Sequence, residues 1–356
     1  MNPYSKLPVR NFWSPSVGQR DWAEISDLWQ PKWQVRRDDK VATFGSCFAQ
    51  HFGKALVKRG YGWTNYEPPL SGLSPETIAA FNYGVFSART GNIYTVGILE
   101  QWINWSTGRA AVPDEIWEKD GRFYDPFRPA IEPDGFEQAD EIAPNRQITL
   151  RAFAKAIAAA DVFVFTLGLT ESWRNLEFGY EYPMCPGTAA GKFDTARHGF
   201  VNTDYPAIRA GLMSSIATMQ SINPDLRILL TVSPVPLTAT ASDNHVLVAT
   251  TYSKSTLRAV AGDVAAGNPL VDYFPSYEII TAPPFGGQFF AANKRNVLPA
   301  GVNHVMKSFF AGQGANDVVE EQPKRIARDV RRKARLSDNL VCEEELLSAF
   351  SKRELP

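Results

Sequence analysis

Two short, largely apolar runs constrain the fold of this 356-residue chain more than any other feature. They are Val162–Leu167 and Arg227–Val232. Runs of this length without polar alternation are typical of parallel strands that are covered on both faces. Helical periodicity lies near them, over residues 148–160, 206–222 and 254–266. The alternation predicts βαβ units and an α/β domain, a three-layer α/β/α arrangement around a parallel, flavodoxin-like sheet.

Further elements extend this pattern toward both ends of the chain. We expect a buried strand over 40–44, a helix from Ser46 to Arg59 that Gly60 closes, a last strand over 269–274 and a helix over 299–310. Ligands bind at the carboxyl ends of the strands in such sheets. Three polar turns follow strands here, at residues 45–47, 168–173 and 233–245. We therefore expect the functional site at this edge.

Two segments before the last helices lack a regular period. Residues 1–40 predict an extended arm that packs its aromatic side chains on the main domain, which we place at 41–315. The arm's tryptophans are Trp13, Trp22, Trp29 and Trp33. Residues 102–149 hold several Trp and Pro, which predicts an aromatic insertion or lid.

The last part of the chain, residues 316–356, predicts a charged helical tail. Residues 324–335 hold seven basic side chains and residues 343–345 are three Glu. We expect a solvated helix whose charges compensate one another. The alternative is a basic patch for nucleic acid or an acidic partner.

Charge and cysteine content argue against several classes of protein. A net charge of −1 gives no electrostatic attraction to nucleic acid or to an anionic membrane. Three widely spaced Cys and four scattered His leave no dense metal site and favour a reducing compartment. No signal peptide or apolar run of about 18 residues is visible. We expect a cytoplasmic protein with no metal, no nucleic-acid partner and no integral membrane segment. The sequence does not determine its oligomeric state.

Ser46 stands in the turn between the first predicted strand and the helix after it. A nucleophile there would be exposed above the sheet, near backbone N–H groups that favour negative charge. Two alternatives compete with this role. Ser46 could be a helix N-cap, where Ser is common, and Cys47 could be the nucleophile, because a helix N-terminus lowers the pKa of a thiol. A serine nucleophile also needs a base, which here would be one of the four histidines.

The residues Gly45-Ser46-Cys47-Phe48-Ala49 spell the signature of the GSCFA-domain family, which this chain resembles. Six further segments look like the family, and with the signature they span most of the chain. They are residues 91–95, 125–129, 167–173, 233–236, 252–255 and 273–278. The family is similar to the SGNH/GDSL hydrolases, in which a nucleophilic Ser occupies the same strand-to-helix turn.

The resemblance implies roles for several residues. Ser46 would be the nucleophile, and its N–H would form an oxyanion hole with donors from two later loops. Thr170 stands where SGNH enzymes carry Asn, and its hydroxyl has a shorter reach. Glu171 would bind a substrate hydroxyl or orient the base. The other residues expected at the site are Gly45, Cys47, Gly91, Asn92, Arg128, Gly168 and Lys254.

The base is where this sequence departs from the SGNH pattern. Those enzymes carry Asp-x-x-His before the last helix, whereas here the two positions are Asn293 and Asn296. Two histidines remain candidates for the base. His304 lies in the last predicted helix, and His245 lies in a loop at the expected catalytic edge with Asp243 two residues before it. We slightly favour His245.

These observations predict serine-dependent acyl transfer by an esterase or an O-acyltransferase (acetyl or similar). The expected substrate is a carbohydrate or polysaccharide precursor or another small molecule. We expect no cofactor, only acyl-CoA or another acyl donor as co-substrate. One alternative is a non-catalytic carbohydrate-binding or polysaccharide-assembly protein on the same fold, which Asn293 and Asn296 favour. Another is a transferase that uses Cys47.

Overall fold

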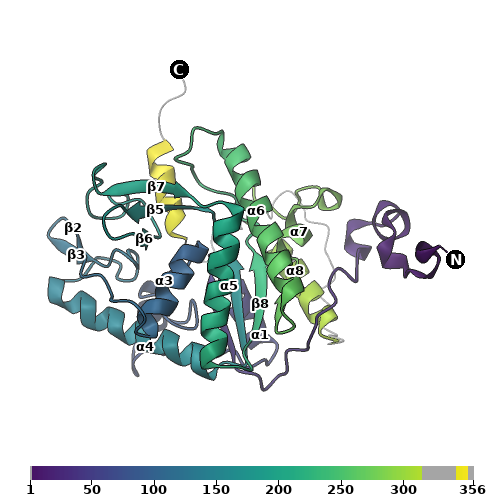
Figure 1. The fold of residues 1–356 in the computed structure, drawn as a ribbon, viewed down its shortest axis with the longest axis horizontal. Helices are drawn as coiled ribbons and strands as arrows, with labels where there is room; N and C mark the ends of the chain where they lie inside the picture. Colours follow the sequence, from purple (N-terminus) through teal and green to yellow (C-terminus); the bar gives the residue numbers. More distant parts are fainter. Residues whose placement is uncertain (1, 315–341, 352–356) are drawn as a thin grey trace. The chain divides into compact units, whose positions relative to one another are not determined.

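The computed structural model describes residues 2–314 and 342–351 (Figure 1). These residues divide into two compact units. The larger unit comprises residues 36–273 and 342–351, and the smaller unit comprises residues 2–35 and 274–314. The arm expected at 1–40 therefore groups with the last helices of the chain.

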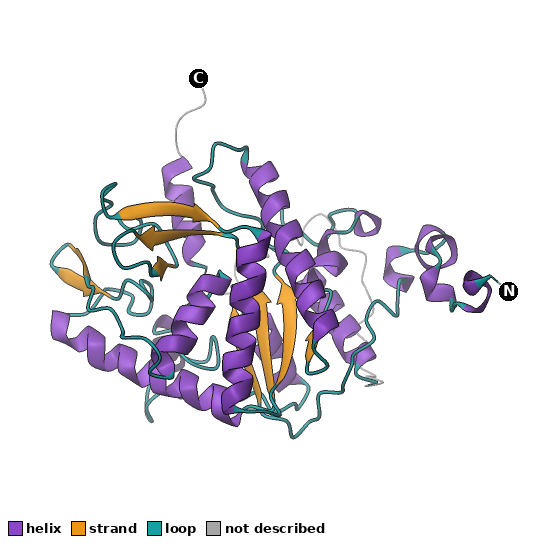
Figure 2. Cartoon of the chain, viewed as in Figure 1, coloured by secondary structure: helices purple, strands orange, loops and turns teal. Residues whose placement is uncertain are grey.

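A parallel sheet in the order β1-β4-β8-β9 forms the centre of the larger unit (Figure 2). Its strands are Val41–Gly45, Val162–Leu167, Arg227–Val232 and Val271–Tyr273. On the other side of β1, Trp63 forms a parallel bridge with Val41. If that bridge is counted as the second strand in chain order, the sheet runs 2-1-3-4-5, which is the flavodoxin-like order.

Helices cover both faces of this sheet. α1 (Ala49–Lys58) packs on β1 and β4, and α6 (Val246–Gly267) packs on β8 and β9. α3 (Val96–Ser106), α4 (Ile142–Ala159) and α5 (Tyr205–Ile222) contact one another, and α5 also contacts α6. Figure 1 shows α5 and α6 on the near side of the sheet and α1 on its far side. The expected three-layer α/β/α arrangement is confirmed.

Residues 102–149, expected to be an insertion or lid, contain regular elements. They include the C-terminal half of α3, the antiparallel pair β2 (Trp117–Lys119) and β3 (Arg122–Tyr124), and the first turns of α4. Three more strands form an antiparallel sheet in the order β6-β5-β7: Glu171–Asn175 (β5), Glu181–Tyr182 (β6) and His198–Asn202 (β7). The short helix α2 (Pro75–Ala80) precedes both groups.

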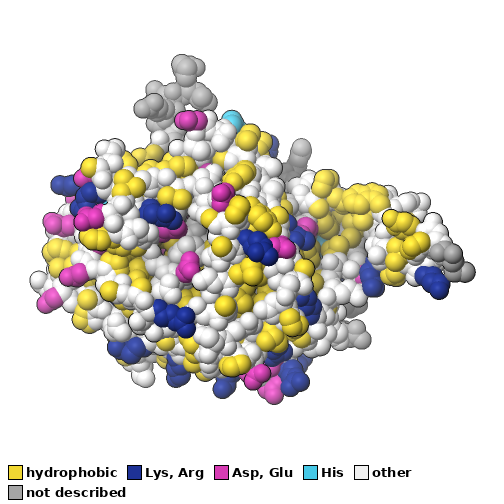
Figure 3. Space-filling view, viewed as in Figure 1, with side chains coloured by type: hydrophobic (Ala, Val, Ile, Leu, Met, Phe, Trp, Pro, Cys, Tyr) yellow, Lys and Arg dark blue, Asp and Glu magenta, His cyan; other side chains and the backbone are white. Residues whose placement is uncertain are grey.

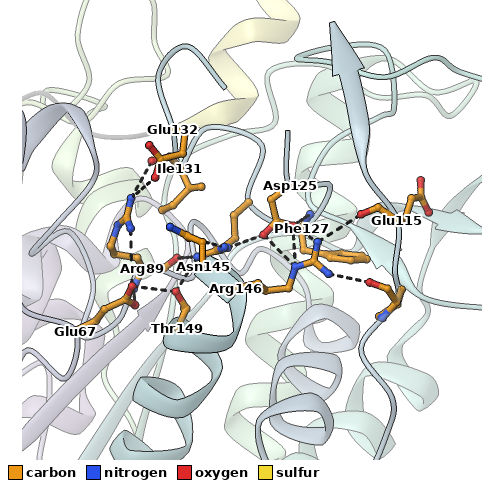
Figure 4. A network of polar contacts seen from close by, with 12 residues as sticks. Glu67, Arg89, Glu115, Asp125, Phe127, Ile131, Glu132, Asn145, Arg146 and Thr149 are labelled. Carbon is orange, nitrogen blue, oxygen red and sulfur yellow. Dashed lines mark hydrogen bonds and ion pairs between the residues drawn. The ribbon is translucent and has the colours of Figure 1, made fainter. Parts of the chain in front are cut away.

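A buried ion-pair network holds the region between β3 and α4 (Figure 4). Asp125 lies 2.8 Å from Arg128 Nε and 2.9 Å from Arg146 Nη2. Arg128 also donates to Thr149 Oγ1 and Asn145 Oδ1. Burial favours a higher pKa for Asp125, but the two guanidinium charges outweigh it and the pKa is lowered. Arg128 is thus committed to internal partners, in contrast to the substrate-binding role expected for it.

The smaller unit contains α7 (Ser276–Thr281), α8 (Pro299–Gly312) and the N-terminal arm. The arm is not simply extended, because it forms short helical turns between Pro3 and Glu24. Another short turn spans Pro283–Phe285.

The arm tryptophans pack unequally. Trp29 is buried, with its ring centroid 5.0 Å from that of Phe274 and 5.4 Å from that of Phe309. Trp22 makes an edge contact with Phe289, whereas Trp13 is 69% exposed. The expectation that all four tryptophans pack is therefore wrong for Trp13.

Most of the predicted charged tail, including residues 324–335, lies outside the described residues. The part that is described, Cys342–Ser351, contains the 3₁₀ helix Glu343–Ser351. Glu343 and Glu344 are buried. The prediction that these glutamates are solvated is therefore wrong.

The surface carries charge of both signs. Figure 3 shows basic and acidic side chains interspersed over the visible face of the larger unit, in line with the net charge of −1. Within residues 2–314 and 342–351, no helix has the length and apolar character that a membrane span requires.

Candidate functional site

The turn after β1 fixes the position of Ser46. Gly45 has φ +125°, and a Cβ there would lie 2.4 Å from the carbonyl oxygen of Thr166 in β4. Only glycine fits such a position. The close approach lets the Ser46 N–H donate to that same oxygen at 3.0 Å. Ser46 therefore lies at the carboxyl edge of the sheet, where β1 and β4 end.

Ser46 is not a helix cap. α1 begins at Ala49, and its N-cap residue, Phe48, makes no side-chain cap hydrogen bond. Ser46 is 2% exposed, so the expected exposure above the sheet is also wrong. Its Oγ has no hydrogen-bond partner in the described part of the chain. Leaving a buried hydroxyl unsatisfied costs about 1–3 kcal/mol, so the position of this hydroxyl calls for an explanation.

The segment Gly91–Thr95 brings two further candidates to Ser46. The Ile93 N–H donates to the carbonyl of Gly45 at 2.9 Å, and the carbonyl of Tyr94 accepts from the Gly168 N–H at 3.1 Å. A Cβ on Gly168 would lie 3.0 Å from the Cβ of Ser46. The structure therefore gathers Ser46, Gly168 and the segment that carries Asn92 at one place.

The donors expected in the oxyanion hole are already used within the fold. The single N–H protons of Ser46 and Gly168 are donated to backbone carbonyls, as described above. Thr170 donates its N–H to Ser253 Oγ at 3.0 Å and its hydroxyl to Asn202 Oδ1 at 2.7 Å. The expectation that these groups bind a developing oxyanion therefore fails in this conformation.

A different donor set lies at the turn of Gly91 and Asn92, and it holds the carboxylate of Glu343. That carboxylate accepts hydrogen bonds from the side-chain amide of Asn92 and, at 2.9 Å, from the hydroxyl of Tyr94. The backbone N–H of Asn92 is a third donor. Gly91 has φ +68°, and a Cβ there would lie 3.4 Å from Glu343 Oε1. We call the three donors of Asn92 and Tyr94 the anion site.

The electrostatics of the anion site follow from its burial. Burial raises the pKa of Glu343, although its hydrogen bonds with Asn92 and Tyr94 act in the opposite direction. Burial also raises the pKa of Tyr94 well above its usual value, and the neighbouring Glu343 adds to the rise. Tyr94 is therefore a neutral donor at neutral pH.

Tyr94 and Glu343 were not identified as site residues from the sequence. The Gly-Asn dipeptide pointed to a donor at Asn92, but the run of three Glu indicated a solvated surface.

Ser46 Oγ has no hydrogen bond to a base among the described residues. His245 is exposed, and its Nδ1 accepts from the Leu247 N–H at 3.1 Å, so it caps the N-terminus of α6. His304 lies in the smaller unit, where its ring stacks on Phe289 at 5.1 Å. Burial lowers the pKa of His304, and Lys307 adds to the effect.

The other two histidines, and Asn293 at the position where SGNH enzymes carry Asp, contact residues close to them in the sequence. His51 is buried in α1, where its ring contacts Phe48. The Nδ1 of His198 accepts from the N–H of Asp194 at 3.0 Å. Asn293 Oδ1 accepts from the N–H groups of Arg295 and Asn296, which stabilises a turn.

Two further expected residues support the turn that follows β4. Lys254 is only 1% exposed, and its Nζ donates to the carbonyl of Gly168 at 2.6 Å, so it is not a solvated side chain. Glu171 accepts from Thr240 Oγ1 at 2.8 Å, and burial raises its pKa. Cys47, the rival nucleophile, is buried next to Ser46 in sequence.

A cavity of ≈ 200 Å³ is lined by residues from α3, α5 and the chain after β4. Its lining includes Thr95 and Leu169, which directly follow Tyr94 and Gly168 in the chain. Polar side chains that can bind hydroxyl groups also line it, namely Glu100, Thr170, Arg174, Glu181 and Thr203. In the described part of the chain, no cluster of three or more His, Cys, Asp and Glu is arranged to hold a metal ion.

Comparison with known proteins gives one match. The model of the GSCFA family matches residues 40–309, which include Ser46, the anion-site donors and the turn after β4. Glu343 lies outside the matched region. No curated protein and no solved structure matches the chain.

Proposed function

The chain belongs to the GSCFA family, and from that premise we propose that it is a serine-dependent acyl-transfer enzyme with Ser46 as the nucleophile. One observation carries the proposal. The buried Oγ of Ser46 has no partner in the described residues, and it lies on a glycine-fixed turn in contact with the segment that forms the anion site. Acyl transfer needs a nucleophile and preorganised oxyanion donors in one region, and the turn that carries Ser46 is hydrogen-bonded to the segment that carries the donors.

The proposed reaction has two steps. Ser46 Oγ attacks the carbonyl carbon of an ester, and the carbonyl electron pair moves to the oxygen. Asn92 and Tyr94 would bind that oxyanion with the donors that now bind Glu343. The hydroxyl proton passes to a base. The oxyanion then collapses, the bond between the carbonyl carbon and the leaving oxygen breaks, and the leaving alcohol takes the proton, which leaves an acyl-serine. Water or a sugar hydroxyl next attacks the acyl-serine, loses its proton and releases Ser46.

The base has to reach Ser46 when substrate is bound, because catalytic hydrogen bonds often form only in that complex. His245 and His304 stay the candidates, and substitution tests each of them.

We propose a carbohydrate or polysaccharide precursor as the acceptor or ester substrate, with acyl-CoA or another acyl donor in the transfer case. The support is the cavity that Thr95 and Leu169 help to line, where Glu100 and the Arg174–Glu181 ion pair keep acceptors and donors for sugar hydroxyls in addition to their internal hydrogen bonds. The absence of a base bonded to Ser46 Oγ among the described residues favours the alternative, a carbohydrate-binding protein without catalysis.

Ester turnover by the purified full-length chain tests the proposal, with p-nitrophenyl acetate and an O-acetylated sugar as substrates. Ser46→Ala should lower kcat by about 10³-fold or more, as loss of a nucleophile does. Ser215→Ala is the matched control, because Ser215 in α5 also has a buried Oγ without a described partner. Unchanged turnover in Ser46→Ala refutes the proposal. Sugar binding without any turnover supports the non-catalytic alternative.

A further inference from the structure

The segment Cys342–Ser351, which we call the C-terminal segment, buries charge in an unusual way. Glu343 is 4% exposed and Glu344 is 8% exposed, although glutamates are almost never buried unless they are paired. Figure 1 shows this segment in yellow. Its Glu343 side chain contacts Asn92 and Tyr94, which precede α3 in the chain.

The carboxylate of Glu343 has the chemistry of a reaction product. Hydrolysis of an ester leaves a carboxylate at the nucleophile, with its oxygens on the donors that bound the oxyanion. Glu343 presents the same group to Asn92 and Tyr94. Cys342 of the same segment also lies close, with its Sγ 3.9 Å from the hydroxyl of Tyr94.

The contacts of Glu343 show why a substrate cannot share the site. Both Asn92 donors and the Tyr94 hydroxyl converge on this one carboxylate. The space beside Gly91 is also filled, since Glu343 Oε1 lies at contact distance from a Cβ built there. A carbonyl oxygen that uses these donors has to displace the carboxylate.

We propose that the C-terminal segment is a built-in competitive inhibitor of the Ser46 site, with Glu343 bound as a product carboxylate would be. The inhibitory role rests on the proposed function of Ser46. Substrate then binds only the molecules in which the segment is released. The apparent Kd for substrate equals the intrinsic Kd divided by the fraction of such molecules. The occupant that the anion site selects is a carboxylate or the oxyanion of an acyl ester.

The test uses the full chain with Glu343→Ala and the milder Glu343→Gln, so that one variant remains if the other fails to fold. The control is Glu345→Ala, an exposed glutamate two residues along the same segment. The first readout is the rate at which a fluorophosphonate modifies Ser46. The second is hydrogen exchange of residues 342–351 and 91–95, which does not depend on catalysis.

We expect Glu343→Ala to speed modification of Ser46 by about tenfold, the size of effect that loss of hydrogen bonds to one charged group produces. We also expect faster exchange in both peptides, an intermediate effect in Glu343→Gln and none in Glu345→Ala. If Ser46 is modified rapidly and no Glu343 variant changes the rate, the inhibitory role of the C-terminal segment is refuted and the proposed function stands. No modification in any variant, despite faster exchange, overturns both.

Discussion

The substitution Gly168→Ala tests whether the contact between the β1 and β4 turns positions the nucleophile. A Cβ at residue 168 would lie 3.0 Å from Ser46 Cβ and 3.0 Å from the carbonyl oxygen of Tyr94. Carbon atoms pack best at about 3.5–4.0 Å, so Ser46 and the Tyr94 carbonyl have to shift by a few tenths of an ångström. The new methyl group therefore acts directly on the proposed nucleophile.

The size of the two effects separates function from stability. Overpacking of this kind costs about 1–3 kcal/mol of folding free energy. A displacement near 1 Å at a reacting group lowers the rate by about 10²-fold, and a shift of a few tenths of an ångström lowers it by less. We therefore expect Gly168→Ala to stay folded and to react with a fluorophosphonate about three- to tenfold more slowly than the wild type.

Urea unfolding and the rate of fluorophosphonate modification, measured on the same preparation, check this prediction. The matched control is Gly267→Ala at the last residue of α6, where a Cβ meets no atom within 4 Å. It should change the unfolding free energy by less than about 1 kcal/mol and leave the rate unchanged. A folded Gly168→Ala protein that reacts at the wild-type rate would show that the contact does not position Ser46.

Three further outcomes follow from single contacts. Asp125→Asn should lower the unfolding free energy at neutral pH by about 3–5 kcal/mol. Because the folded pKa of Asp125 is lowered, its carboxylate stabilises the fold above about pH 4, and the difference from wild type in urea titrations should shrink below that. A constant difference down to about pH 3 contradicts this. His245→Ala should cost about 1 kcal/mol as a lost cap and leave kcat within about threefold, whereas a hundredfold loss would identify His245 as the base. Trp102→Ala, at a fully buried position, should cost about 3–5 kcal/mol, and Trp13→Ala less than about 0.5 kcal/mol; similar unfolding midpoints would refute the packing assignment.

The central elements could be predicted because their signals are local. The strand expected at 162–167 is β4, and the helix expected at 206–222 is α5 to within one residue. The start of α6 was placed late, at 254 instead of Val246. Its first turn exposes the apolar side chains of Leu247 and Val248 to solvent. Apolar residues on the exposed face obscure the helical periodicity of the sequence there.

The site was less predictable because its decisive contacts join distant parts of the chain. Because Gly45 and Ser46 follow a buried strand in the sequence, the position of Ser46 at the carboxyl edge of the sheet could be predicted. The bond between Asn92 and Glu343 spans 251 residues, and no local pattern reports such a contact. Three successive glutamates ordinarily face solvent, so the sequence favoured the wrong environment for Glu343.

The central claim is that Ser46 is the nucleophile, and peptide mapping of the fluorophosphonate adduct tests it most directly. The wild-type chain should carry one adduct, on the peptide that contains Ser46, and Ser46→Ala should carry none. An adduct on Cys47, or one that persists in Ser46→Ala, would contradict the claim.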